Sequence, residues 1–170
     1  MEKRSSRQKQ KRGFRMIKSI GVIGAGATGA SIGSSLYARY KENMCFIATG
    51  ERAKKLECEG LLINGERIIP PVCSEKHSIK LDLVLICVKN YSLEETLNDL
   101  KHFVDDHTII LPLLNGVTAV QRTREAFPNN SVPYGIILRT DAERIGKNIT
   151  VSVKGEIQIG FGKGDEITCD

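Results

Sequence analysis

Three glycines at the end of a short apolar run are the residues of this sequence best suited to chemistry. The run covers residues 17–23, and an apolar pattern of helical spacing follows it. At such a turn the first glycine allows a sharp bend, the second lets the backbone approach a diphosphate, and the third lets the helix pack closely on the strand. Amide groups at the helix N-terminus would face the phosphates. We therefore expect the ADP-pyrophosphate part of NADP(H) or NAD(H) to bind at Gly24, Ala25, Gly26, Ala27, Thr28 and Gly29. The alternative is a glycine turn with a purely structural role.

The end of the second predicted strand should select between the two cofactors. An Asp or Glu there binds the ribose 2′-hydroxyl of NAD, whereas an Arg favours the 2′-phosphate of NADP. This sequence has the neutral Thr49, followed by Glu51 and Arg52, which carry opposite charges. Arg52 would bind the 2′-phosphate, or it is an ordinary solvated helix residue. The residues alone leave NADP and NAD both open.

Two further polar residues follow apolar strands at the edge where ligands bind in open α/β sheets. Lys89 follows the run at residues 83–88, and Asn115 follows the run at residues 108–111. A cation and an amide at this edge could orient a nicotinamide and a substrate carbonyl. The alternatives are a surface lysine and an Asn-Gly turn.

The elements that would position these residues alternate between strand and helix. This order predicts an α/β, Rossmann-type fold, an open, mostly parallel twisted sheet with helices on both faces. We expect its strands at residues 17–23, 44–48, 83–88, 108–111 and 132–138. Two helices are expected to begin at residue 29 and at Ser92. Two more are expected at residues 51–59 and 116–127, and Gly60 should end the first of these. Ser92 and Glu95 have the spacing of a capping box.

Two hairpins complete the predicted elements. Residues 61–69 should form one, with a type I′ turn at Asn64-Gly65. Residues 149–159 should form the other, with its turn at Lys154-Gly155.

The net charge of +5 belongs to one short segment. Residues 1–15 hold seven Lys and Arg against one Glu, so the other 155 residues carry a net charge of −1. A nucleic-acid-binding domain carries its basic patch on the folded surface. We expect a basic disordered tail at 1–15, one dinucleotide-binding domain at 16–170, and no nucleic-acid partner.

Neither a membrane protein nor a disulfide framework is expected. No apolar run approaches the roughly 20 residues that span a bilayer. The five cysteines are odd in number, which argues against a closed disulfide framework. They form no C-x-x-C pair, and no metal site is predicted. Cys45 and Cys87 lie in apolar runs and should be small core side chains. A reducing cytoplasm is the expected location.

The glycine loop, Lys89, the run Leu114-Asn115-Gly116-Val117 and the late hairpin through Gly160 together resemble the ketopantoate reductase (2-dehydropantoate 2-reductase) family. The resemblance covers about residues 16–162. It implies an oxidoreductase that reduces the 2-keto acid ketopantoate to pantoate with NADPH, in pantothenate biosynthesis. It also implies that Lys89 and Asn115 contact cofactor and substrate and that Ala142 lines the cofactor site.

Two departures from the family pattern matter. Many members have an arginine where this sequence has Thr49, although Arg52 could replace it, and we expect NADPH to bind more tightly than NADH. The family also has a C-terminal helical domain that supplies the proton donor and most substrate contacts, and we expect that domain to be absent here.

The resemblance therefore predicts a chain that binds the cofactor and is nearly inactive alone. A dimer, or a partner chain that supplies the second domain, would complete the site. The alternative function is a stand-alone dinucleotide-binding module or a truncated, non-catalytic relic.

Overall fold

Five short strands form an all-parallel sheet at the centre of the molecule. The computed structural model describes residues 16–77, 79–114 and 118–162. In spatial order the sheet is β5-β2-β1-β6-β7. Its strands are β1 (Ile20–Ile23), β2 (Met44–Ile47), β5 (Val72–Cys73), β6 (Leu83–Ile86) and β7 (Ile109–Pro112). β1 and β2 are buried at every residue, as expected for parallel strands covered on both faces.

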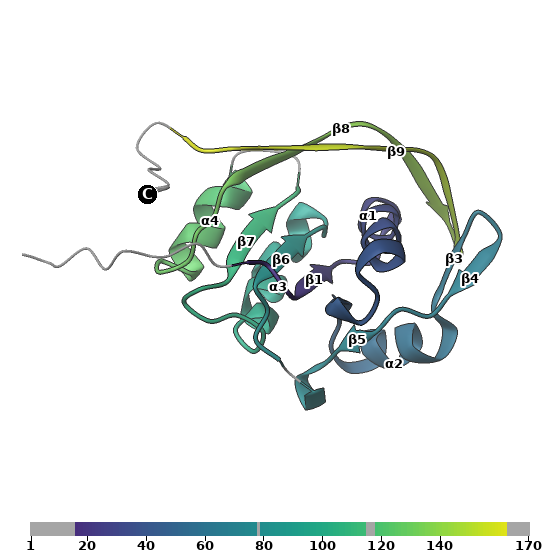
Figure 1. Ribbon diagram of the computed structural model, residues 1–170, viewed down its shortest axis with the longest axis horizontal. Coiled ribbons are helices and arrows are strands. Elements are labelled where there is room, and N and C mark those ends of the chain that lie inside the picture. The colour runs from purple at the N-terminus through teal and green to yellow at the C-terminus, as the bar shows by residue number, and fades with distance from the viewer. Residues whose placement is uncertain (1–15, 78, 115–117, 163–170) are drawn as a thin grey trace, which may run out of the picture.

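Helices cover both faces of this sheet, which confirms the predicted Rossmann-type architecture (Figure 1). They are α1 (Ala27–Tyr40), α2 (Gly50–Glu59), α3 (Leu93–Leu100) and α4 (Thr118–Ala126), with short 3-10 turns η1 (Lys41–Asn43), η2 (Glu75–His77) and η3 (Asn90–Ser92). α3 and α4 contribute Leu97 and Val120 to one buried cluster. α1 contributes Ala30 and Ile32 to the other cluster, on the opposite face.

A second sheet lies over α1 and was only partly foreseen. Its strand order is β4-β3-β9-β8, made by β3 (Leu61–Ile63), β4 (Glu66–Ile68), β8 (Tyr134–Ile145) and β9 (Asn148–Gly160). Figure 1 shows β8 and β9 as one long ribbon that passes over α1 and ends beside β3 and β4. The short β3–β4 hairpin matches its prediction, because Asn64 and Gly65 both have positive φ values, 51° and 82°.

Two expectations about the last strands were wrong. Residues 132–138 were expected in the parallel sheet, but β8 begins at Tyr134 and pairs antiparallel with β9. The predicted turn at Lys154-Gly155 lies inside β9, and the hairpin turns instead at Gly146-Lys147. Gly155 has a φ of 74° opposite Arg139 at 55°, and the pairs on either side of them keep one register, so the left-handed backbone lies within a continuous strand.

The predicted capping box is also wrong. Ser92 is the residue before α3, but its side chain makes no capping hydrogen bond. Its backbone, at φ −97° and ψ 2°, belongs to the 3-10 turn η3 and lacks the extended conformation of a normal N-cap.

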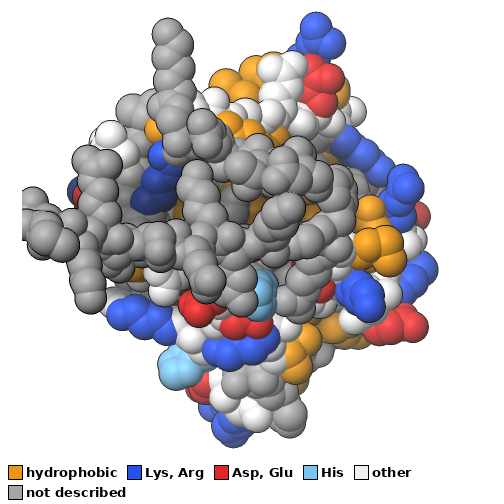
Figure 2. Space-filling model, turned by 60° about the vertical axis from the view of Figure 1, so that its left-hand side comes forward, with side chains coloured by type: hydrophobic (Ala, Val, Ile, Leu, Met, Phe, Trp, Pro, Cys, Tyr) orange, Lys and Arg blue, Asp and Glu red, His pale blue; other side chains and the backbone are white. Residues whose placement is uncertain are grey.

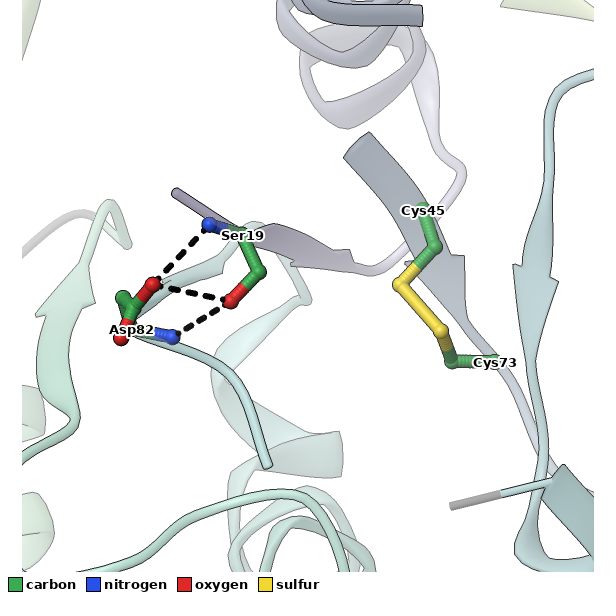
Figure 3. Close-up of a disulfide and its surroundings, with 4 residues drawn as sticks. All are labelled: Ser19, Cys45, Cys73 and Asp82. Carbon is green, nitrogen blue, oxygen red and sulfur yellow. Dashed lines mark hydrogen bonds between the residues drawn. A yellow bond between two sulfur atoms is a disulfide. The ribbon is translucent and has the colours of Figure 1, made fainter. Parts of the chain in front are cut away.

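Polar and sulfur contacts link neighbouring strands of the parallel sheet (Figure 3). Ser19 and Asp82, just before β1 and β6, exchange three hydrogen bonds of 3.0–3.1 Å. Cys45 in β2 is buried as predicted, but it also forms a disulfide with Cys73 in β5, although no disulfide framework was expected. The pairing brings together strands that are neighbours in the sheet.

The surface mixes charged and apolar groups. On the face in Figure 2, Lys and Arg side chains lie among acidic ones and hydrophobic side chains reach the surface in several places. Within the described ranges no helix has the length and apolar character needed to cross a membrane.

Candidate functional site: a cavity at the carboxyl edge of the parallel sheet

The glycine loop lies where the chain leaves β1 and enters α1. Gly24 has a φ of 101°, which favours glycine, and Gly26 is the N-cap of α1. No side chain among the described residues caps this end of the helix, and its first turn holds no acidic residue. The first amide groups of α1 are therefore available to an anion, and the positive end of the helix dipole adds to the attraction.

Each glycine of the loop meets the requirement of a diphosphate-binding turn. A Cβ at Gly24 would lie 2.6 Å from the carbonyl oxygen of Cys87, and one at Gly29 would overlap the carbonyl oxygen of Gly24. A Cβ at Gly26 would instead project into open space. Gly24 and Gly29 thus allow close packing, and Gly26 leaves free volume above the loop, where a diphosphate would lie.

The end of β6, the strand next to β1, is hydrogen-bonded to β1 just before the loop. The amide of Cys87 donates a 2.8 Å hydrogen bond to the carbonyl of Ile23, so the end of β6 is held against the end of β1. Burial raises the pKa of the Cys87 thiol to about 12. Cys87 is therefore a neutral packing group under the loop.

A cavity of about 520 Å³ opens beside the loop. Its floor includes residues at the ends of β1 and β2, and its walls come from α2, α3 and the second sheet. Its lining includes two residues of the glycine loop and the polar or charged side chains around it, namely Gly24, Ala25, Thr49, Arg52, Lys55, Glu59, Arg67, Thr96, Asp99, Arg144 and Lys147. This volume is within the range of ligand-binding pockets.

Basic side chains outnumber acidic ones around the cavity. Five line it, namely Arg52, Lys55, Arg67, Arg144 and Lys147, against two carboxylates, Glu59 and Asp99. A concave site lined mainly by one sign of charge concentrates ligands of the other sign. The cavity therefore favours an anionic ligand.

Several of these cations have only weak or partial partners. Arg52 lies 3.6 Å from Glu95, and their side chains are 71% and 62% exposed. Lys147 approaches Glu59 to 2.9 Å, and this hydrogen bond holds the pKa of Glu59 below its usual value. Exposed ion pairs contribute little to stability, so either cation can turn to a bound anion at small cost.

The structure brings together some of the predicted site residues. Thr49 and Arg52 line the same cavity as Gly24 and Ala25. Lys89 is exposed and follows β6, the neighbour of β1, on the other side of the loop from β2. The boundary between β1 and β6 is where the strand order reverses, which is the usual ligand position in such sheets.

One other predicted residue, Ala142, does not line the cavity. It lies at the irregularity in β8 between Asp141 and Ala142. Asn115 lies outside the described residues. In the described ranges no group of three or more His, Cys, Asp or Glu side chains could hold a metal ion.

Sequence reasoning missed the residues supplied by distant segments. Asp99 comes from α3, and its carboxylate accepts a 3.0 Å hydrogen bond from the hydroxyl of Thr49. Arg144 and Lys147 come from the end of the β8–β9 hairpin, about 120 residues after the loop. Lys55 alone had a local signal, because it follows Arg52 by one helical turn.

Comparison with known proteins agrees with this geometry. The family model described as ketopantoate reductase PanE/ApbA matches residues 20–164. The chain belongs to the ketopantoate reductase family. Among curated members and relatives, a 2-dehydropantoate 2-reductase of Lactococcus lactis is 32% identical over 123 residues, and an uncharacterized oxidoreductase, YkpB, of Bacillus subtilis is 31% identical over 119. Each match covers 68% of this chain but 39% of the relative.

Solved structures share the fold. A D-mandelate dehydrogenase in complex with NADH and anilino(oxo)acetate superposes with a TM-score of 0.73 at 23% identity, covering 87% of this chain and 50% of the other. A ketopantoate reductase of the PanE/ApbA family from Ralstonia eutropha gives a TM-score of 0.69 at 24% identity, covering 83% and 48%. The chain thus spans about half or less of the ketopantoate reductase relatives it matches.

Proposed function

We propose that this chain is the dinucleotide-binding part of an NADP(H)-dependent oxidoreductase that reduces a 2-keto acid, with 2-dehydropantoate as the first substrate to test. The observation that carries the proposal is the glycine loop, in which Gly26 faces open space beside the uncapped N-terminus of α1. A loop of this form binds the pyrophosphate of a dinucleotide through backbone amides.

The charge of the cavity supports NADP over NAD. Thr49 at the end of β2 lacks the carboxylate that would hold a ribose 2′-hydroxyl from this position. Arg52 and Lys55 lie one helical turn apart on the cavity wall and can attract a 2′-phosphate. Asp99 opposes them, and the cations outnumber the carboxylates.

The residues of this chain would bind, orient and shield the cofactor. When bound, the reduced nicotinamide supplies a hydride to the keto carbon of the substrate. Lys89 and Asn115, which follow two adjacent strands, would contact nicotinamide and substrate at the carboxyl edge. Positioning of this kind lowers the entropic part of the barrier.

Full turnover would require groups beyond those described here. General acid catalysis contributes about 10²–10⁴ in rate, and the family resemblance places the proton donor in a C-terminal domain. We therefore expect the 170-residue chain to bind the dinucleotide but to turn over slowly unless a second domain or partner chain completes the site.

A stand-alone dinucleotide-binding module is the second candidate. It rests on the same observations, because the glycine loop and the cavity concern dinucleotide binding and not turnover. The two candidates differ in whether substrate turnover appears when a C-terminal half from a relative is added.

A titration of the purified chain with NADPH and NADH tests the proposal. Nicotinamide fluorescence should report saturable binding, with the lower Kd for NADPH. Absence of binding of either dinucleotide at millimolar concentration would refute the dinucleotide-binding function itself.

A further inference from the structure

The side chain of Arg144 crosses from the second sheet to the glycine loop. Its Nη1 group donates a 2.5 Å hydrogen bond to the carbonyl of Ala25, 119 residues earlier in the chain. Its Nε group donates a 3.1 Å hydrogen bond to the carbonyl of Gly146 in the hairpin turn. Arg144 and Ala25 both line the 520 Å³ cavity. The loop is therefore contacted by an arginine from outside the parallel sheet.

The end of the hairpin that holds Arg144 is firmly anchored. Ile149, just after the turn, is 1% exposed and belongs to the same buried cluster as Met44 of β2. The Asn64 side chain donates to the carbonyl of Val151 and accepts from its amide, at 3.0 and 2.8 Å. β9 also pairs in parallel with β3. The position of the Arg144 backbone is thus set by the core.

The guanidinium retains donors for a ligand. It has five N–H groups, and its hydrogen bonds to other described residues use Nη1 and Nε. The two Nη2 donors have no partner among the described residues, and the side chain is exposed to the cavity. Arginine in this state can bind two phosphate oxygens with a pair of parallel hydrogen bonds.

We propose that Arg144 is a pyrophosphate-binding residue, supplied by the β8–β9 hairpin to the glycine loop. The inference rests on the proposed dinucleotide-binding function and adds a residue to it. The loop amides and the helix dipole provide partial charges, and Arg144 provides a full positive charge beside them. Because the pyrophosphate is common to both dinucleotides, Arg144 should contribute equally to NADPH and NADH binding.

Two substitutions distinguish two roles of Arg144. In one role its positive charge binds the pyrophosphate, and in the other its hydrogen bond only holds the loop in place. Arg144→Ala removes both the charge and the bond to Ala25. Arg144→Gln removes the charge but keeps an amide donor that can reach for the Ala25 carbonyl. Arg122→Ala is the matched control, because Arg122 is a half-exposed arginine on α4 outside the cavity lining. Circular dichroism of each variant establishes that the fold is retained.

The Kd values of NADPH and NADH are the readouts for all four proteins. We expect Arg144→Ala and Arg144→Gln each to raise both Kd values about tenfold or more, since charge-assisted hydrogen bonds are the strong ones, and Arg122→Ala to leave both unchanged. Wild-type affinity in Arg144→Ala or in Arg144→Gln would overturn the inference, as would a loss confined to NADPH. Failure of the wild-type chain to bind either dinucleotide would instead overturn the proposed function, and this inference with it.

Discussion

The hydroxyl of Thr49, at the end of β2, donates a 3.0 Å hydrogen bond to a carboxylate oxygen of Asp99 on α3. Both residues line the cavity beside the glycine loop, as do Gly24 and Ala25 of the loop itself. A carboxylate is thereby held at the strand end where cofactor selection occurs, although it comes from a helix 50 residues later. Its charge would oppose a 2′-phosphate and would suit a ribose hydroxyl.

Asp99→Asn should therefore shift the protein towards NADPH. The amide keeps an acceptor for Thr49 and removes a negative charge, so the Kd of NADPH should fall about three- to tenfold relative to that of NADH. Fluorescence titrations with both dinucleotides measure the ratio. Asp106→Asn is the control, since Asp106 is exposed outside the cavity lining. An unchanged ratio in Asp99→Asn would mean that this carboxylate does not face the 2′ position.

Arg52→Ala should have the opposite effect on selectivity. Arg52 lies on the cavity wall and, among the described residues, forms an exposed ion pair with Glu95. Its loss should raise the Kd of NADPH about fivefold or more and change that of NADH little. Lys54→Ala provides the comparison, because Lys54 is on the same helix, pairs with Glu51 and is outside the lining. An equal effect on both dinucleotides would remove Arg52 from cofactor selection.

Gly26→Val tests the loop without disturbing the fold. The backbone at Gly26, at φ −70° and ψ −171°, is open to any residue, and a side chain there would project into free space. We expect a normal thermal melt but about a hundredfold or greater loss of affinity for both dinucleotides, because the side chain would occupy the volume above the loop. Gly160→Val, at another open glycine outside the cavity lining, should bind normally. Retained binding in Gly26→Val would place the dinucleotide elsewhere.

Features of the fold and of the candidate site could be predicted from the sequence where the residues that form them are close together along the chain. The glycine loop was predictable because strand, turn and helix are contiguous from Ile20 to Tyr40. The same holds for the Asn64-Gly65 turn, where two neighbouring residues need positive φ values. Asp99 and Arg144 could not be placed, because only the tertiary fold brings them to the loop.

The wrong predictions have local causes as well. Lys154-Gly155 has the composition of a turn, but Gly155 adopts its positive φ within β9, where the pairing with β8 continues on both sides. Ser92 and Glu95 have capping-box spacing, but the preceding 3-10 turn sets the backbone of Ser92 differently. Each residue type suits two conformations. The pairing with β8 set the one that Gly155 adopts, and the 3-10 turn η3 set the one that Ser92 adopts.

The Cys45–Cys73 disulfide should contribute to stability. It closes a loop with a sequence separation of 28, for which loop-closure entropy gives roughly 3–4 kcal/mol. Urea unfolding with and without dithiothreitol should show a loss of up to that size. The double variant Cys45→Ala/Cys73→Ala should be insensitive to the reductant. Equal midpoints for the wild-type protein in both conditions would argue against the bond in solution.

Cys87 should resist alkylation up to high pH. Burial raises its pKa from 9.0 to about 12, so the native state keeps the proton that the unfolded chain releases above pH 9. The stabilisation from this group is complete below pH 9 and decreases as the pH rises towards 12. Peptide mapping after iodoacetamide treatment at pH 9 should find Cys58, which is exposed, modified long before Cys87. Comparable rates at the two sites in the folded protein would contradict the raised pKa and partial burial of Cys87.

A crystal structure of the chain with NADPH tests the central claim most directly. The diphosphate oxygens should lie within hydrogen-bonding distance of the backbone amides at the N-terminus of α1, above Gly26, with the adenosine part in the cavity lined by Thr49 and Arg52. Density for the dinucleotide at another site, or none at saturating concentration, would contradict dinucleotide binding at this loop.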